Sequence, residues 1–572
     1  MPKLSSRAKL LNWTGFRNRE DQISIILSIV IGVVVGLTVV AFILLTGRLA
    51  SRMYPPGSPA WNRLFIPVLG TLVSGYLLFR YFPGARGSGI PQTKFALFIQ
   101  DGYISLRTVI GKFVCCSISL ASGIALGREG PSVQIGAGIA SVLGRRFGLS
   151  KTNVKALLPV GSAAALAAAF NTPIAAVLFS LEEILGNLHA PVLASVVLSS
   201  ATSWMVLHLI LGDQPLFHVP AYRLVNPLEF GIYAILGVIG GLGSVCFVKL
   251  LLKLRIRFKQ FPESTVWLQP VAGGLLIGLF GLFRPEALGV GYDYIDRVLS
   301  GDFPIKIVAL LAVMKIIATP VCYSSGNAGG IFGPSLFIGA MIGGTVGSIA
   351  HTLFPSVTAN PGAYALVGMG TAFAGIVRTP LTSVIMIFEM TRDYSIIVPL
   401  MISNLISFFI SQQLQPEPIY EALALQEGVY LPTGESREEL TGVPVSEKMK
   451  TGIEMLPSDL DIASAKLRVE REKHHSWPVG DHNYLRGVVS MHEIETAQPP
   501  PVVVRDLIDV NAAYPYVHPD HPLSHALERM GANGVDVVPV VSRANIHAMY
   551  GVITLSDILA TYGILGTPAP KQ

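Results

Sequence analysis

The chain has 572 residues, of which 51% are hydrophobic and only 14% are charged, and its mean hydropathy is +0.55. Soluble domains carry about 25% charged residues, so the composition excludes an ordinary soluble protein and indicates a polytopic membrane protein. The formal net charge is +6. Because no basic patch with interleaved aromatic residues accompanies it, we attribute the positive charge to the orientation of the protein in the membrane and expect no nucleic-acid partner.

The first apolar run, residues 23–46, contains no charged residue over more than the roughly 20 residues that a spanning helix needs. It is too long for a signal-peptide core and no small-residue cleavage site follows, so we expect it to be retained. The preceding segment, 1–22, is basic, which places the N-terminus in the cytoplasm by the positive-inside rule. We therefore expect a multi-pass protein of the inner membrane with both termini in the cytoplasm.

Further apolar windows follow along the chain, at 64–79, 191–212, 230–248, 266–283, 335–354 and 395–414. Composition becomes polar and charged beyond residue 415, and no spanning segment follows. We predict a membrane domain over 23–415 and a linker over 416–442.

An internal repeat divides the membrane domain. "GPSVQIGA" at 130–137 returns as "GPSLFIGA" at 333–340, and a longer stretch that begins at Gly161 returns at Gly368. The matches keep their order, with nearly constant offsets of 203 and 207 residues. Two homologous halves are therefore predicted, and internal repeats are a common plan of transporters that bind substrate where the halves meet. The predicted halves span about 23–215 and 228–412.

The repeated Gly-Pro-Ser segments are typical of helix starts, because glycine permits the turn and proline is tolerated at the first helical position. Free amides and the positive end of the helix dipole then face whatever lies in front, which favours an anion. "GSGIP" at 87–91 and "GGIFGP" at 329–334 have the same chemistry. Any one motif is also compatible with a plain interfacial turn, but the three together favour an anion site.

Only the first copy is preceded by charge, in "GREGP", which contains Glu129. A carboxylate at membrane depth costs about 2.5–3.5 kcal/mol, so it needs a partner. We interpret Glu129 as a tethered competitor that occupies the anion site when ionised and leaves it when protonated. A structural pair with Arg128 or Lys112 is the alternative, and the two roles are compatible.

Together with a late tyrosine in "PEPIYEAL", the motifs "GSGIP", "GREGP" and "GIFGP" resemble those of the CLC family of chloride channels and chloride/proton antiporters. The resemblance covers about residues 20–420. It implies an all-α membrane fold, an inverted repeat of two helical halves, and a homodimer in the lipid bilayer with one pathway in each subunit.

The same resemblance assigns roles to residues of this chain. Ser88 would coordinate the central anion through its hydroxyl, Glu129 would be the external gate, and the backbone amides of Ile331 and Phe332 would complete the site. Tyr420 would supply an inner hydroxyl; the alternative is an interfacial anchoring tyrosine. A serine at position 88 favours chloride in this family and leaves bromide and nitrate open.

The segment "FSLEE" bears on the choice between channel and antiporter. Glu182 matches Glu389 across the repeat and is interpreted as structural, whereas Glu183 faces Met390 and has no counterpart. In family antiporters the second glutamate accepts the internal proton, so the resemblance implies chloride/proton antiport with Glu183 in that role and no cofactor. A solvated acid at a helix end is the alternative for Glu183, and a passive chloride channel is the alternative for the protein.

The soluble tail carries two similar units on either side of "QPPPV" at 498–502, and it resembles a tandem pair of α/β CBS domains, predicted at 443–498 and 499–566. The resemblance makes Thr554 and Asp557, in "GVITLSD", adenine-nucleotide ligands. Such pairs of residues are also helix capping boxes, which leaves a dimerising scaffold as the alternative.

Because CBS pairs also regulate cation transporters, that class is a further alternative, although the anion motifs argue against it. The cysteines lack metal-ligand spacing, so no metal site is expected. No nucleophile–base constellation is found, and an enzyme is not expected.

Overall fold

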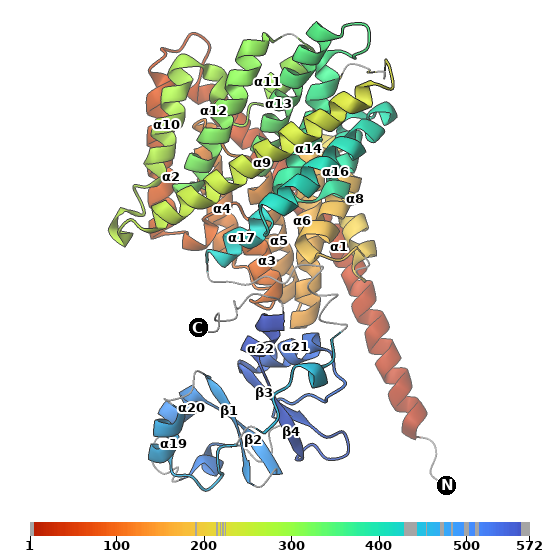
Figure 1. Ribbon diagram of the computed structural model, residues 1–572, viewed down its shortest axis with the longest axis vertical. Coiled ribbons are helices and arrows are strands. Elements are labelled where there is room, and N and C mark those ends of the chain that lie inside the picture. The colour runs from red at the N-terminus through yellow and green to blue at the C-terminus, as the bar shows by residue number, and fades with distance from the viewer. Residues whose placement is uncertain are drawn as a thin grey trace, which may run out of the picture. The chain divides into compact units, whose positions relative to one another are not determined.

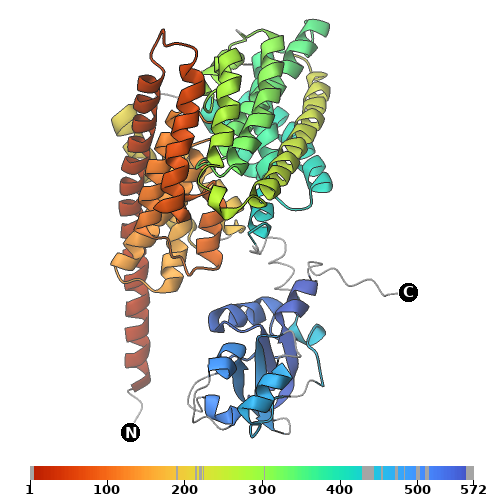
Figure 2. The same ribbon diagram turned by 90° about the vertical axis from the view of Figure 1, so that its left-hand side faces the viewer.

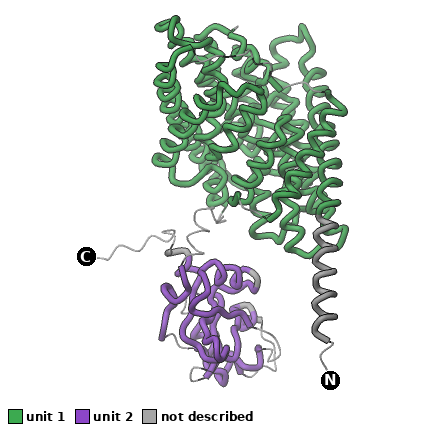
Figure 3. Tube along the Cα trace, turned by 90° about the vertical axis from the view of Figure 1, so that its right-hand side faces the viewer, with its two compact units in different colours: residues 1–431 green, residues 432–572 purple. Residues whose placement is uncertain are grey.

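The computed structural model forms two compact units, residues 1–431 and 432–572 (Figure 3). It describes residues 5–188, 191–212, 216–217, 219, 222, 225–301, 303–427, 443–452, 455–469, 474–481, 484–496, 503–508 and 514–561. The first unit is helical and the second combines helices with short strands (Figure 1). The "QPPPV" break, the part of the predicted linker from 428 to 442, and the predicted end of the tail beyond 561 lie outside the described residues.

The helices of the first half follow one another in the order α1 (Ser5–Met53), α2 (Asn62–Arg80), η1 (Pro83–Ala85), α3 (Ile90–Phe98), α4 (Leu106–Ala121), α5 (Glu129–Arg146), α6 (Lys151–Phe170), α7 (Pro173–Phe179), η2 (Ser180–Leu185) and α8 (Leu193–Leu211). Those of the second half are α9 (Glu229–Lys259), η3 (Glu263–Thr265), α10 (Pro270–Phe283), η4 (Pro285–Ala287), α11 (Tyr292–Leu299), α12 (Ile305–Ser324), α13 (Phe332–Leu353), α14 (Pro361–Val377), α15 (Pro380–Thr391), η5 (Tyr394–Ile396) and α16 (Ile397–Leu414). A final helix, α17 (Ile419–Leu425), follows.

The element order repeats, with α1 to α8 matched one by one by α9 to α16. Figure 2 shows the first half in red to orange and the second in green to cyan as two neighbouring groups of helices. The prediction of two homologous helical halves is therefore confirmed.

Eight helices in the described part of the chain are long and apolar enough to span a membrane. The sequence windows missed two of them, α6 and α12. Lysine explains both omissions, because Lys151 and Lys155 begin α6 while Lys306 and Lys315 interrupt α12. A charged residue that finds partners inside the bundle is compatible with a spanning helix.

The repeated "GPSVQIGA" and "GPSLFIGA" segments also pack their helices closely. A Cβ atom on Gly136 of α5 would lie 2.2 Å from the carbonyl oxygen of Gly161 on α6, and one on Gly339 of α13 would lie 2.2 Å from that of Gly368 on α14. Only glycine allows backbones to approach this closely. The final glycine of each segment is thus explained by helix packing.

Two buried lysines fix the loops that lead to α3 and α11. Lys112 on α4 and Lys315 on α12 occupy equivalent positions, 203 residues apart. Their ammonium groups bind carbonyl oxygens: Lys112 Nζ binds those of Ala85 and Gly87 at 2.9 and 2.7 Å, and Lys315 Nζ binds those of Ala287 and Gly289 at 3.0 and 2.5 Å. Buried charges require such partners, so each lysine holds a loop start in place.

The second unit contains two antiparallel hairpins, β1 (Ser476–Asp481) with β2 (Tyr484–Ser490) and β3 (Val537–Val541) with β4 (Met549–Thr554). Its helical elements are η6 (Val445–Glu447), α19 (Ile462–Val469), α20 (Met491–Thr496), η7 (Val504–Leu507), α21 (Leu523–Asn533) and α22 (Leu555–Thr561). Each hairpin has a register shift at an equivalent place, after Val479 in one and after Val540 in the other. The tandem α/β repeat of the tail is therefore confirmed.

In the tail, the first segment of each CBS-like repeat packs in the hydrophobic core of the other repeat. Val445, near the start of the first CBS-like repeat (443–498), packs in a core with Val538 and Ile553 of the second repeat. Val504, near the start of the second repeat (499–566), packs in a core with Val479 of the first repeat. The predicted limits 443–498 and 499–566 follow the sequence repeat, whereas the packed cores cross them.

Candidate functional site

The three anion-site motifs come together at one point. Gly127 and Gly330, in repeat-related loops, exchange two backbone hydrogen bonds of 2.7 Å. A Cβ atom on Gly130 would lie 2.6 Å from the carbonyl oxygen of Ser88 and 3.3 Å from the Cα atom of Gly330. Residues of "GSGIP", "GREGP" and "GGIFGP" are thus in contact around Gly130, although 242 residues separate Ser88 from Gly330.

Each motif stands at the start of a helix. α3 begins directly after Gly89, whose φ of +106° requires glycine, α5 begins at Glu129, and α13 begins at Phe332. All three helix N-termini carry free amides and a partial positive charge. The surroundings of Ser88, Glu129 and Phe332 are therefore suited to an anion.

Glu129 is fully buried and lies against the start of α13 in the other half. Its carboxylate accepts a hydrogen bond from the Gly333 backbone amide at 3.3 Å and another from the Tyr292 hydroxyl. Arg128 Nε is 3.9 Å from Oε1, whereas Lys112 binds backbone carbonyls instead. In this structure the carboxylate itself thus occupies an anion position at the start of α13.

Tyr292 was missed by the sequence analysis. It is the first residue of α11 and the repeat counterpart of Ile90, which begins α3. The guanidinium of Arg128 lies over its ring, 5.5 Å from the centroid. The repeat therefore hides its polar role, because the matching residue is aliphatic, and only the three-dimensional arrangement brings its hydroxyl to Glu129.

Ser88 and Tyr420 are both fully buried, and neither hydroxyl has a hydrogen-bond partner among the residues that the structure describes. A buried unpaired hydroxyl costs about 1–3 kcal/mol, so each is suited to bind a ligand. Tyr420 is close enough to Glu129 and to Glu183 to interact with both electrostatically.

Ile331 and Phe332 are buried at the start of α13. The Phe332 ring packs on Phe170, Phe179 and Phe373 at centroid distances of 4.7, 5.6 and 4.3 Å. Rigid aromatic packing fixes this helix start, which orients the backbone amides that follow it.

Glu182 and Glu389 cap each other's helices across the repeat. Glu182 accepts hydrogen bonds from the Thr382 amide and hydroxyl at 2.8 and 2.6 Å, at the start of α15. In the same way, Glu389 accepts them from the amides of Ile174 and Ala175 at 3.0 and 2.7 Å, at the start of α7. This reciprocity agrees with the structural interpretation of both carboxylates.

Glu183 differs from its neighbour, because it is buried and points to a cation. Its carboxylate forms an ion pair of 2.8 Å with Lys94 on α3, and Lys94 Nζ also binds the carboxylate of Glu421 on α17. Burial of Glu183 disagrees with the alternative of a solvated helix-end acid. Lys94 and Glu421 were missed by the sequence analysis. Lys94 is 89 positions from Glu183 and 327 positions from Glu421, and nothing local in the sequence links residues at such separations.

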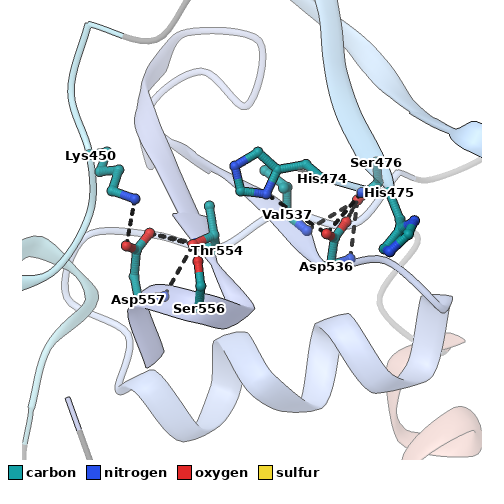
Figure 4. Close-up of polar contacts among 9 residues, drawn as sticks. All are labelled: Lys450, His474, His475, Ser476, Asp536, Val537, Thr554, Ser556 and Asp557. Atoms are coloured by element: carbon teal, nitrogen blue, oxygen red, sulfur yellow. Dashed lines mark hydrogen bonds and ion pairs between the residues drawn. The ribbon is translucent and has the colours of Figure 1, made fainter. Parts of the chain in front are cut away.

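In the tail, Thr554 and Asp557 bind each other (Figure 4). The Thr554 hydroxyl donates to Asp557 at 2.6 Å, and the Asp557 amide donates back to that hydroxyl at 3.1 Å. Lys450 pairs with the same carboxylate at 2.7 Å. These contacts are those of a capping box and use the groups that would bind a nucleotide.

Figure 4 also shows a polar link between the two hairpins. Asp536, which precedes β3, accepts hydrogen bonds from the Ser476 hydroxyl at 2.6 Å and the His475 amide at 2.9 Å. Ser476 in turn accepts from the amide of Val537 at 3.1 Å. The link joins β1 to β3, which agrees with a scaffold role of the tail.

Comparison with known families gives two matches. Residues 70–412 match the model of the voltage gated chloride channel family, and residues 504–563 match the CBS domain. The H(+)/Cl(-) exchange transporter ClcA of Vibrio campbellii is 34% identical over 373 residues, which cover 64% of this chain and 80% of that protein. ClcA of Salmonella paratyphi B is 33% identical over 374 residues, covering 64% and 78%.

Solved structures share the fold. A slow cyanobacterial Cl-/H+ antiporter superposes with a TM-score of 0.65 at 27% identity and covers 71% of this chain and 97% of its own. A eukaryotic CLC transporter gives a TM-score of 0.67 at 21% identity and covers 93% and 97%. At that identity the second likeness supports the fold alone.

Proposed function

The chain is a member of the voltage gated chloride channel family, the CLC family, and from this premise we propose that it exchanges chloride for protons across the inner membrane. The observation that carries the proposal is the position of the Glu129 carboxylate, which is buried among three helix N-termini and hydrogen-bonded to the Gly333 amide. The protein groups that hold this carboxylate can also bind a free anion, which therefore competes with Glu129 for the same place. The relatives named as H(+)/Cl(-) exchangers support the same substrates.

We assign the anion site to the hydroxyls of Ser88 and Tyr420 and to the backbone amides at Ile331 and Phe332. Both hydroxyls are buried with no partner among the described residues, and the amides stand where the dipole of α13 favours negative charge. Together these groups replace part of the hydration shell of chloride without any fixed cation.

Glu129 serves as both gate and proton carrier in this proposal. Chloride that reaches the site displaces the carboxylate, which takes a proton from the outer side and turns away neutral. When the proton leaves towards the inside, the charged carboxylate returns to Gly333 and Tyr292. Chloride and protons therefore move in opposite directions through one cycle, and no bound cofactor is required.

Glu183 accepts the proton on the inner side. Its burial and its ion pair with Lys94 hold the carboxylate at a fixed place near Tyr420. A passive channel on the same fold needs no such acid. The presence of two buried glutamates, Glu129 and Glu183, therefore favours exchange over passive flow.

We further propose that the protein works as a homodimer with a pathway in each subunit, that both termini face the cytoplasm, and that the tail is a scaffold. The capping contacts of Thr554 and Asp557 favour the scaffold over nucleotide binding. Transport of this kind involves no covalent chemistry, so no enzymatic activity is proposed.

Proton movement in liposomes that contain the purified protein tests the exchange, with a chloride gradient as the sole driving force and Glu183→Gln as the comparison. We expect uphill proton flux with the wild-type protein, and chloride flux with most of the proton flux lost with the variant. Chloride flux without proton flux in both proteins would instead make this a channel.

A further inference from the structure

Glu183 does not stand alone on the inner side. Lys94 of α3 forms ion pairs with Glu183 of η2 and with Glu421 of α17, and all three side chains are almost completely buried. Three elements far apart in the sequence thus bring two carboxylates to one ammonium group. Resting on the exchange proposed above, we propose that Glu183 and Glu421 form one inner proton site, bridged by Lys94.

Charge is the first argument. With Lys94 protonated and both carboxylates ionised, the group carries one unbalanced negative charge in a buried place. Burying an uncompensated charge costs several kcal/mol, and two carboxylates that share a site cannot both ionise easily. One added proton makes the group neutral, and such a proton belongs to the pair of carboxylates and not to either one.

The free oxygen of Glu421 is the second argument. Its Oε2 atom is buried and has no hydrogen-bond partner in the described part of the chain. An ionised oxygen in that position is costly, whereas a protonated one is neutral. Glu421 therefore offers a position for the proton, while its other oxygen remains bound to Lys94.

Location is the third argument. Glu421 follows Tyr420, whose hydroxyl we assign to the anion site, so one short helix carries an anion ligand and a proton ligand side by side. Glu183 lies in a π-helical turn, whereas the matching helix of the second half, α15, is α-helical throughout. Such turns occur frequently at functional sites.

Other charged and titratable groups face this site. Glu182 is next to Glu183 but is held at the start of α15, and Arg378 interacts electrostatically with Glu421. Tyr323 lies near Tyr420. None of these brings a further carboxylate to Lys94 among the described residues, so the pair can be tested by changing Glu183 and Glu421 alone.

Proton and chloride fluxes of the full-length protein in liposomes test the proposal, measured over a range of inner pH for wild type, Glu421→Gln, Glu183→Gln and the double variant. Glu417→Gln is the matched control, because it removes an exposed carboxylate four residues before Glu421. Persisting chloride flux reports correct folding of each variant.

We expect Glu421→Gln to shift the pH of half-maximal proton flux to lower pH by about one unit or more, the size expected when a like charge within about 4–6 Å is removed. Glu417→Gln should leave the profile unchanged. Glu183→Gln should retain a residual proton flux that the double variant loses.

A Glu421→Gln profile that matches wild type would overturn the shared site and leave Glu183 as the single acceptor. Complete loss of proton flux in Glu183→Gln would also overturn it, because a shared site keeps Glu421 as an acceptor. Wild-type protein that moves chloride but no protons would refute the exchange itself, which is a different outcome.

Discussion

The hydroxyl of Tyr292 holds the Glu129 carboxylate in the anion site, so its removal should free that site for chloride. Tyr292→Phe deletes one oxygen and keeps the ring under the guanidinium of Arg128. A hydrogen bond to a charged group contributes about 1.5–3 kcal/mol. At 1.4 kcal/mol for each factor of ten, the carboxylate should occupy the site about 10 to 150 times less often relative to its displaced position.

Chloride competes with that carboxylate, so its apparent dissociation constant should fall by up to the same factor. Isothermal titration of chloride into purified protein at neutral pH measures this constant directly. Tyr294→Phe is the matched control, because Tyr294 lies on the same helix and packs its ring against Phe303. Equal chloride affinity in the two variants, or weaker binding in Tyr292→Phe, would refute the competition.

Three further predictions concern stability and the tail. Glu389→Gln weakens the cap on α7 and should lower the free energy of unfolding by about 1–2 kcal/mol. When detergent-solubilised protein is heated, the monodisperse peak should be lost at a lower temperature. The same temperature for the variant and the wild type would mean that the reciprocal caps do not contribute to stability. Burial and the neighbouring His525 and His518 lower the pKa of His521, so the folded tail binds fewer protons than the unfolded chain, and its resistance to proteolysis in the full-length protein should fall as the pH drops below about 6.5. The hydrogen bond from Arg543 lowers the pKa of Asp520 to about 2, so the Asp520 carboxylate remains ionised over this pH range. His521→Gln should therefore make the resistance to proteolysis depend less on pH. An unchanged pH dependence in His521→Gln would contradict the role of His521. Adenine nucleotide should leave the rate of proteolysis of the tail unchanged. Protection by the nucleotide that disappears in Asp557→Asn would instead support a nucleotide site at Thr554 and Asp557.

The sequence predicts the parts of the site that are local. Glycine and proline specify where a helix starts, so the starts of α3, α5 and α13 could be located from "GSGIP", "GREGP" and "GGIFGP". The repeat also separates residues that appear in both halves from those that appear in one. By this comparison Glu182 was interpreted as structural, which agrees with its contacts at the start of α15.

Partners that meet only in three dimensions could not be predicted. Lys94 lies in a short apolar helix and Glu421 follows the last apolar window, and no sequence spacing relates them to Glu183. Tyr292 matches an isoleucine in the other half, so the comparison of halves gave it no polar role. These side chains are specified by the folding of separate elements onto one another, which periodicity and composition do not describe.

Glu129→Gln separates the two roles proposed for Glu129, as the gate and as the proton carrier. The variant is reconstituted into liposomes, and chloride flux and chloride-driven proton flux are recorded together at several pH values. The amide resembles the protonated carboxyl group, so we expect chloride flux that persists and no longer depends on pH, with no proton flux. Proton flux coupled to chloride in Glu129→Gln would mean that Glu129 is not the proton carrier.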